Sequence, residues 1–222
     1  GDVPTPAFMP VATQGSVKAV SPQELRELEA KIILANTYHL YLRPGPELVR
    51  QMGGLAAFMG WNGPMLTDSG GFQAYSLGSK VKISDEGVTF QSVIDGSRHL
   101  FTPEKAVEHQ KAIGADIIMA LDQCLVYTQD KEAVRQAMER THRWAERCRQ
   151  AHTSDAQALF GIVQGGVFPD LREQSAAFIT GLDLPGYAIG GLAVGESKAT
   201  MYPLVSHTAN LLPADKPRYL MG

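Results

Sequence analysis

Polar and glycine residues follow directly on several short apolar segments of this 222-residue sequence. Where parallel strands close into a barrel, their carboxyl ends meet at one rim, and barrel enzymes carry their chemistry there. If the apolar segments are such strands, their polar followers lie side by side. The segments that would occupy the rim are Asp68-Ser-Gly-Gly-Phe-Gln73, Asp122-Gln-Cys124, Gln164-Gly-Gly166 and Gly190-Gly-Leu-Ala-Val-Gly-Glu196.

The residue types in these segments suit the recognition of a flat heterocycle. Asp68 and Asp122 supply carboxylates and Gln164 supplies a carboxamide, while the glycines let backbone N–H groups approach a ligand closely. Acceptors and donors in one plane match a ring with several N–H and C=O groups, such as a purine-like base. Each feature alone is more often a helix cap or a turn, so the prediction depends on their combination.

The other polar residues favour structural roles. We expect His39 to be packed and hydrogen-bonded rather than catalytic, and Cys124 and Cys148 to be reduced thiols. The histidines contain no pair at metal-ligand spacing, so the sequence assigns no metal to this chain. A series of arginines is expected to form a solvated helix face, with a phosphate-binding ridge as the alternative. The series comprises Arg135, Arg140, Arg143, Arg147 and Arg149.

Short apolar segments that alternate with helical patterns predict parallel βαβ units. The expected strands are Ala7–Val11, Ile32–Ala35, Met65–Thr67, Ile117–Leu121, Leu159–Val163, Tyr187–Ile189 and Tyr219–Met221. Helix-start signals predict helices from Ser21 to about Ala30, from Thr102 to about Ile113 and from Asp130 to about His152. The segment Lys80–Ser92 alternates on both sides of Asp85-Glu-Gly87, which predicts a β-hairpin insertion.

Composition and pattern indicate one α/β domain over residues 1–222. Hydrophobic residues make up 44% and charged residues 19%, and the net charge of −3 gives no basic excess for nucleic acid or an anionic membrane. The apolar runs are too short to cross a membrane, so we expect a cytoplasmic protein. The strands fit a (β/α)8 TIM-type barrel of which about seven of the eight units are here, because both ends of the sequence look cut.

The rim motifs, in their order, closely resemble those of the tRNA-guanine transglycosylases, also called queuine tRNA-ribosyltransferases. The similarity covers essentially the whole chain and includes Ile33-Leu-Ala-Asn-Thr-Tyr-His-Leu40 and Val163-Gln-Gly-Gly166. The resemblance implies a (β/α)8 barrel and a pentosyltransferase of queuosine biosynthesis. Such an enzyme exchanges guanine at the wobble position of the tRNA anticodon loop for a 7-deazaguanine base, through a covalent enzyme–ribose intermediate.

The resemblance also implies a role for individual residues. Asp68 is the proton acceptor, which acts as general acid and base on the heterocycle. Asp122 and Gln164 recognise the base through their side chains, and Gly191 and Leu192 through their backbone. The pocket wall is formed by Ser69, Gly70, Gly71 and Phe72, with Phe72 stacked on the base, and Met221 resembles a residue of the pocket floor.

Cys124 and Val194 resemble specificity positions of the bacterial form, which takes preQ1 (7-aminomethyl-7-deazaguanine). A queuine-type enzyme is the alternative. The chain departs from the bacterial pattern after Asp122, because the family has Asp-Glu-Cys followed by Pro-Tyr-Pro. Here Gln123 replaces the glutamate, and Tyr127 has no proline on either side.

The resemblance places two further parts of the family beyond Gly222, namely the nucleophilic aspartate of the eighth barrel unit and a Cys3His zinc subdomain. We therefore expect this chain alone to be inactive, and we expect the full-length protein to bind one structural zinc and to form a homodimer.

Two other interpretations stay open. The non-catalytic partner subunit of the same family shares the barrel, although it has no need of Asp68 for proton transfer. An unrelated (β/α) barrel enzyme predicts a Schiff-base lysine at a strand end or a late phosphate-binding loop. Neither is evident, because Lys80, Lys82 and Lys111 fall in the predicted hairpin or in a helix.

Overall fold

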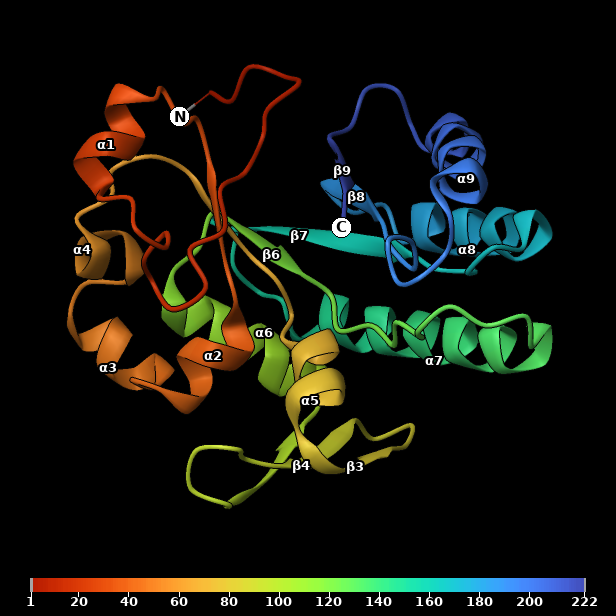
Figure 1. The fold of residues 1–222 in the computed structure, drawn as a ribbon, viewed down its shortest axis with the longest axis horizontal. Coiled ribbons are helices and arrows are strands. Elements are labelled where there is room, and N and C mark those ends of the chain that lie inside the picture. Colours follow the sequence, from red (N-terminus) through yellow and green to blue (C-terminus); the bar gives the residue numbers. More distant parts are fainter. Residues whose placement is uncertain (1, 222) are drawn as a thin grey trace.

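The computed structural model describes residues 2–221, and in this part of the chain six parallel strands form one curled sheet (Figure 1). The strand order is β1-β2-β6-β7-β8-β9, so the sheet grows in one direction along the sequence. The strands are β1 (Ile33–Ala35), β2 (Met65–Thr67), β6 (Ile117–Met119), β7 (Ala158–Val163), β8 (Gly186–Ile189) and β9 (Arg218–Leu220). This half-barrel confirms the predicted α/β class and the incomplete TIM-type barrel.

The prediction of a first strand at Ala7–Val11 is wrong. In the described chain it is reduced to a single parallel bridge between Val11 and Leu34. Leu34 N donates to Pro10 O at 3.0 Å and Ala12 N donates to Leu34 O at 2.6 Å. Pro10 within the segment and Pro6 directly before it have no N–H to extend this pairing into a ladder, so the curled sheet begins with β1.

The three helices predicted from their start signals are confirmed. They are α1 (Pro22–Glu27), α6 (Pro103–Ile113) and α7 (Lys131–Ala151). Ser21 forms a capping box, Thr102 Oγ1 accepts from Lys105 N at 3.3 Å, and Asp130 Oδ1 caps α7. Gly114 ends α6 in the left-handed region with φ +83°. The first helix is shorter than predicted, since it stops at Glu27.

The remaining helices connect the strands or cover the sheet. They are α2 (Thr37–Leu42), α3 (Pro46–Gln51), α4 (Leu55–Met59), α5 (Gly71–Leu77), α8 (Pro169–Gly181) and α9 (Lys198–Leu211). In Figure 1, α7, α8 and α9 lie together along one side of the curled sheet. No helix within residues 2–221 is both long and apolar enough to span a bilayer.

Both faces of the sheet are buried, because side chains alternate between them along each strand. The cluster inside the curl consists of Ile32, Leu34, Leu66, Met119, Phe160, Ile162 and Ala188. Residues of the other face, such as Ile33, Met65 and Ile118, join the larger core under the helices. Trp144 and Cys148 of α7 are fully buried in that core.

The predicted hairpin insertion is present as part of a larger sheet. The insertion sheet is antiparallel, in the order β3 (Ser79–Ile83), β4 (Val88–Gln91) and β5 (Arg98–Phe101). The third strand was not predicted. Figure 1 shows this sheet next to α5, away from the curled sheet.

The arginine series of α7 only partly matches the expected solvated face. Arg140, Arg143 and Arg147 bind the β3–β4 turn or Glu104, with contacts such as Arg147 Nε to Glu104 Oε1 at 2.7 Å. Three of the five arginines therefore attach the insertion sheet to the barrel.

Candidate active site

The strand ends bring the predicted rim residues together. Asp68 follows β2, Asp122 follows β6 and Gln164 follows β7, and these strands are neighbours in the sheet. Gln164 Nε2 donates to Asp122 Oδ2 at 2.7 Å. The sequence thus predicted the juxtaposition, while the roles assigned to these residues stay predictions.

Asp68 is buried and held by groups that follow β1. Asn36 Nδ2 donates to Oδ2 at 2.5 Å, and Thr37 N donates to Oδ1 at 2.8 Å. Gly70 N donates to Oδ1 at 3.2 Å. Burial raises the pKa of Asp68, although these hydrogen bonds favour the charged carboxylate. A carboxyl group with opposing influences on its ionisation is suited to accept and return a proton.

Asn36 and Thr37 belong to the Ile33–Leu40 motif of the sequence, but their contacts with Asp68 were not predicted. A signal was present, because the two polar residues follow β1 directly, at the same rim as the other segments. Hydrogen bonds between two loops of the rim depend on the conformation of each loop, which the pattern of the sequence does not show.

The glycines after Asp68 permit close backbone packing. Gly70 has φ +79°, and a Cβ there would lie 2.9 Å from Tyr38 N. A Cβ on Gly71 would lie 2.8 Å from Leu121 Cδ1. Ser69 is buried, and its Oγ accepts from Gly71 N at 3.3 Å. The predicted wall therefore starts as a tight turn that leads into α5.

Asp122 shares a small hollow with Cys124 and Phe72. Burial, opposed by the hydrogen bond from Gln164 and assisted by the charge of Asp68, raises the pKa of Asp122 to about 6. Burial and the Asp122 charge raise the pKa of Cys124 to about 12, so this side chain is a neutral thiol. The side chain of Phe72 is 40% exposed, which leaves its ring available for stacking. The hollow is lined by Gly71, Phe72, Tyr75, Ile83, Val88, Asp122, Gln123 and Cys124.

Gln164 is fixed by its backbone and faces the loop after β8. Gln164 N donates to Ser175 Oγ at 3.0 Å. Gly191 has φ +66°, and a Cβ at this position would overlap Gln164 Oε1, so only glycine lets the carboxamide lie against this backbone. Leu192, the next residue, is buried and belongs to the large core.

Arg172 of α8 joins two of the rim loops, and sequence reasoning missed it. Its side chain is fully buried. Nε donates to Gly166 O at 2.7 Å, and Nη2 donates to Gly190 O at 3.0 Å and to Gly191 O at 3.3 Å. Burial lowers its pKa to about 10, so it remains charged at neutral pH. A buried arginine is unusual, but nothing in the sequence distinguishes it from a surface arginine of an amphipathic helix.

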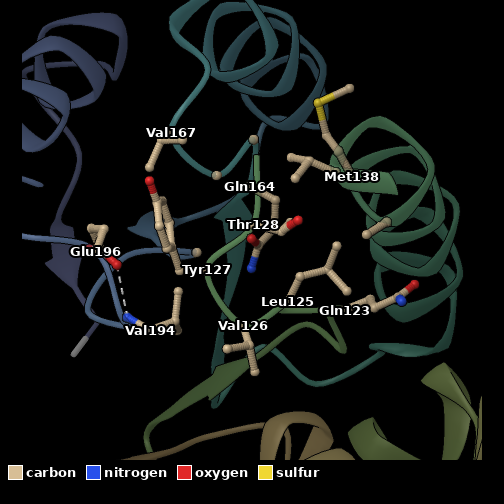
Figure 2. Close-up of a pocket in the computed structure, with 15 residues that line it drawn as sticks. Gln123, Leu125, Val126, Tyr127, Thr128, Met138, Gln164, Val167, Val194 and Glu196 are labelled. Carbon is tan, nitrogen blue, oxygen red and sulfur yellow. Dashed lines mark hydrogen bonds between the residues drawn. The ribbon is translucent and has the colours of Figure 1, made fainter. Parts of the chain in front are cut away.

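A second hollow lies beside Gln164 (Figure 2). It is enclosed by the loop after β6, the N-terminal part of α7 and the glycine loops after β7 and β8. Val194 lines it, and Glu196 accepts from Ala193 N at 2.6 Å and from Val194 N at 3.1 Å. Tyr127 N donates to Val194 O at 3.1 Å, which attaches the two loops to each other. Cys124 therefore lines the hollow beside Asp122, whereas Val194 lines this one, and Gln123 lines both.

The remaining sequence-predicted residues have clear positions. Met221 N donates to Ile189 O at 3.2 Å, and the Met221 side chain packs on the cluster inside the curl. His39 is half-buried and meets the Tyr38 ring edge-on, with ring centroids 5.3 Å apart. Among residues 2–221, no three His, Cys, Asp or Glu side chains gather as a metal site would require.

These observations define a class of protein. Parallel strands of a (β/α) barrel end in two buried carboxylates, one carboxamide and two glycine-rich loops whose backbone approaches the same space. Such a rim can hold a planar, hydrogen-bonding ring and can exchange a proton with it.

The chain belongs to the queuine tRNA-ribosyltransferase family, whose family model matches residues 1–222. It is 60% identical over 222 residues to the queuine tRNA-ribosyltransferase of Pelotomaculum thermopropionicum and 58% identical over 222 residues to that of Desulforamulus reducens. It is 60% identical over 223 residues to that of Desulforudis audaxviator. Each comparison covers all of this chain and 60% of the relative, so the chain spans about three fifths of the length of these proteins.

Proposed function

We propose that the protein is a tRNA-guanine transglycosylase that replaces guanine at the anticodon wobble position of tRNA with preQ1. Membership of the family supports the reaction class. The observation that carries the proposal is the hydrogen-bonded pair of Asp122 and Gln164, buried beside Asp68. Unpaired, these groups are costly to bury, at roughly 1–3 kcal/mol each, so a base that satisfies them is favoured over one that does not.

In this proposal the base lies flat on the rim. Asp122 and Gln164 bind its edge through their side chains, and Gly191 and Leu192 present backbone groups. The absence of a side chain on Gly191 lets the Gln164 carboxamide lie directly against this backbone, so the side-chain and backbone groups proposed to bind the base are adjacent. Phe72 stacks on the ring, and its 40% exposure supports that role. Ser69, Gly70, Gly71 and Met221 complete the wall and floor.

Asp68 moves the proton in the proposed reaction. The bond between ribose C1′ and the guanine nitrogen breaks as a carboxylate bonds to C1′, and the departing guanine takes a proton. The incoming base then loses a proton as its nitrogen attacks C1′ and releases the carboxylate. Asp68 supplies the first proton and accepts the second, so it ends each cycle unchanged. We place the nucleophilic carboxylate beyond Gly222.

The preferred substrate rests on Cys124 and Val194. The neutral, partly buried Cys124 thiol lines the hollow beside Asp122, and the branched Val194 side chain lines the hollow beside Gln164. That supports a compact aminomethyl substituent over the bulkier queuine, which is the second candidate. The buried Asp68 favours a catalytic subunit over the non-catalytic partner of the family.

Other properties of the full-length protein are proposals taken from the family. They are one structural zinc, a homodimer and a cytoplasmic location. The residues described offer no set of ligands for that zinc, so no step of the reaction is assigned to it.

Calorimetric titration of the full-length protein with guanine, preQ1 and queuine tests the proposal. We expect preQ1 to bind more tightly than queuine, and Asp122→Ala to abolish this binding. Asp155→Ala is the matched control, because Asp155 is exposed in the α7–β7 loop. If the folded protein binds none of the three bases, base recognition at this rim is wrong.

A further inference from the structure

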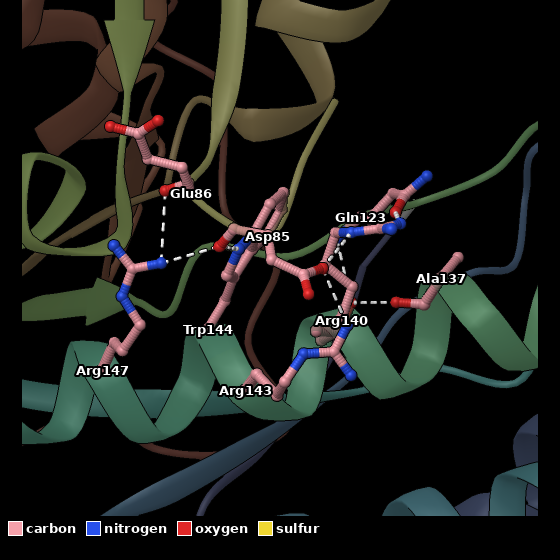
Figure 3. A network of polar contacts seen from close by, with 9 residues as sticks. Asp85, Glu86, Gln123, Ala137, Arg140, Arg143, Trp144 and Arg147 are labelled. Atoms are coloured by element: carbon pink, nitrogen blue, oxygen red, sulfur yellow. Dashed lines mark hydrogen bonds and ion pairs between the residues drawn. The ribbon is translucent and has the colours of Figure 1, made fainter. Parts of the chain in front are cut away.

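The turn between β3 and β4 is tied to α7 by several side chains (Figure 3). Asp85 Oδ1 accepts from Arg140 Nε at 3.0 Å and from Arg143 Nη2 at 2.8 Å. Asp85 O accepts from Trp144 Nε1 at 2.9 Å and from Arg147 Nη1 at 2.8 Å. The turn of the insertion sheet is therefore held through both its side chain and its backbone.

Arg140 makes a second contact on its other side. Its Nη1 donates to Gln123 Oε1 at 2.6 Å. Gln123 N donates to Thr141 Oγ1 at 2.9 Å, so α7 holds both the backbone and the side chain of this residue. Gln123 lies between Asp122 and Cys124 in the sequence. A shift of Gln123 therefore moves two of the residues proposed to recognise the base.

The insertion sheet also forms part of the hollow next to Asp122. Ile83 from β3 and Val88 from β4 line this hollow together with Phe72. Asp85 lies in the turn that joins these two strands. The turn is therefore connected to the rim in two ways. Its flanking residues Ile83 and Val88 line the hollow, and Asp85 binds Arg140, which binds Gln123.

The charges explain why Asp85 matters to Arg140. Gln123 accepts a hydrogen bond from the guanidinium but cannot neutralise it. Asp85 supplies the anion, and the hydrogen bonds from Arg143 and Arg140 hold the pKa of Asp85 below its usual range. With an anion at Nε and an amide oxygen at Nη1, the planar guanidinium has a fixed orientation.

We propose that Asp85, through Arg140 and Gln123, is a positioning residue for the loop that carries Asp122 and Cys124, so that the insertion sheet sets the affinity of the rim for the incoming base. This inference rests on the proposed function. It gives the insertion sheet a part in substrate recognition although Asp85 does not touch the base.

The test is Asp85→Asn in the full-length protein, with base exchange followed by labelled guanine or preQ1. We expect KM for the base to rise about three-fold or more, which is the size of effect expected from the loss of one partly exposed ion pair. We expect kcat to be unchanged, because the substitution leaves the contacts of Asp68 intact. Arg140→Lys should also raise KM, since lysine keeps the charge but lacks the planar guanidinium that donates to Asp85 and Gln123 at the same time. Arg149→Gln, on the same helix, is the control.

Rescue separates positioning from a merely structural role. Gln123→Glu places a carboxylate at the 2.6 Å contact with Arg140. In the Asp85→Asn background this gives Arg140 a new anion, and we expect KM to return to within about two-fold of wild type. In the wild-type background it adds a charge beside Asp122, and we expect KM to rise. Such a reversal of sign is a coupling that independent sites do not show.

Additive effects of the two substitutions, or an unchanged KM in a folded Asp85→Asn protein, overturn the inference and leave the proposed function intact. If wild-type protein neither binds nor exchanges a base, the proposed function fails and the inference fails with it. Circular dichroism and thermal unfolding of each variant show that the differences do not come from loss of the fold.

Discussion

Burial raises the pKa of both aspartates of the rim, but the groups that oppose or assist this effect differ between them. Asp68 receives hydrogen bonds from Asn36, Thr37 and Gly70, which favour its charged form against burial. Asp122 accepts a side-chain hydrogen bond from Gln164 and also feels the charge of Asp68. These different surroundings suit the two roles proposed for them, a proton carrier at Asp68 and a base-recognising group at Asp122.

The raised pKa of Asp122 predicts a dependence of stability on pH. Its pKa is about 6 in the folded chain against 3.8 for the free group. Between about pH 4 and pH 6 the unfolded chain loses this proton while the folded chain keeps it, so the unfolded state binds fewer protons and stability falls as pH rises. A difference of about two pKa units corresponds to about 3 kcal/mol of stability. This contribution is present below about pH 4 and is fully lost above about pH 6.

Asp122→Asn removes that ionisation while an amide oxygen still accepts from Gln164. We expect the variant to gain up to about 3 kcal/mol over wild type at pH 7 and little at pH 4, and to lose affinity for the base. Urea unfolding at pH 4, 5, 6 and 7 measures the difference. A gain that does not vary with pH would mean that Asp122 is already charged in the folded protein.

Arg172 is expected to be essential for both stability and rim geometry. Arg172→Met removes the donors to Gly166, Gly190 and Gly191 and leaves buried carbonyl oxygens without partners. We expect the free energy of unfolding to fall by about 2–4 kcal/mol. Chemical unfolding checks this, with Arg149→Met as the exposed control. Equal stability of the two variants would show that the loops do not depend on the guanidinium.

At the scale of elements, the insertion sheet depends on one close approach. A Cβ on Gly87 would overlap Phe101 O, so Gly87→Ala must separate β4 from β5. Gly96 lies in the β4–β5 loop with φ +76° and has open space, since the nearest atom to its Cβ is 3.6 Å away. Gly96→Ala should therefore lose only about 1 kcal/mol through backbone strain.

Hydrogen exchange of the β3–β5 amides distinguishes these two glycine variants. We expect exchange to accelerate throughout the insertion sheet in Gly87→Ala and to change little in Gly96→Ala. If the two variants exchange alike, the insertion sheet tolerates separation of β4 from β5 and does not need this close approach.

The sequence predicted the elements that have strong local signals. The capping residues Ser21, Thr102 and Asp130 marked three helix starts, and apolar runs marked every strand of the curled sheet. Short helices such as α2 and α4 escaped prediction because fewer than two turns give no reliable period. The Ala7–Val11 strand was predicted wrongly because its apolar composition outweighed Pro10 within it and Pro6 directly before it.

Prediction of the candidate site was limited in the same way. Positions after strands identified Asp68, Asp122 and Gln164, because strand order along a barrel follows the sequence. Side-chain contacts between a helix or hairpin and a distant loop could not be predicted from the sequence. Arg172 reaches back from a helix to the glycine loops, and Asp85 reaches α7 from a hairpin, and neither contact leaves a periodic pattern.

At the scale of the whole molecule, the curled sheet buries its inner apolar cluster but is less well covered at its last strand, β9. Tyr219 and Met221 pack on that cluster and are only partly buried. The Leu220 side chain on β9 is 51% exposed. Within the described residues, the strands that carry Asp68, Asp122, Gln164 and Gly191 are consecutive neighbours in the sheet, from β2 to β8.

The 222-residue chain on its own is therefore expected to bind preQ1 without exchanging it into tRNA. The rim carboxylates that the structure describes accept hydrogen bonds: Asp68 from Asn36 and Thr37, Asp122 from Gln164, and Glu196 from two backbone N–H groups. In the proposed reaction these three groups carry the proton, bind the base and hold the loop after β8, and the bond to ribose C1′ is assigned to another carboxylate. Titration with preQ1 and incorporation of labelled guanine into tRNA, each compared with the full-length protein, measure the two steps separately. Labelled tRNA formed by the 222-residue chain as the only protein would show that one of these three carboxylates is the nucleophile.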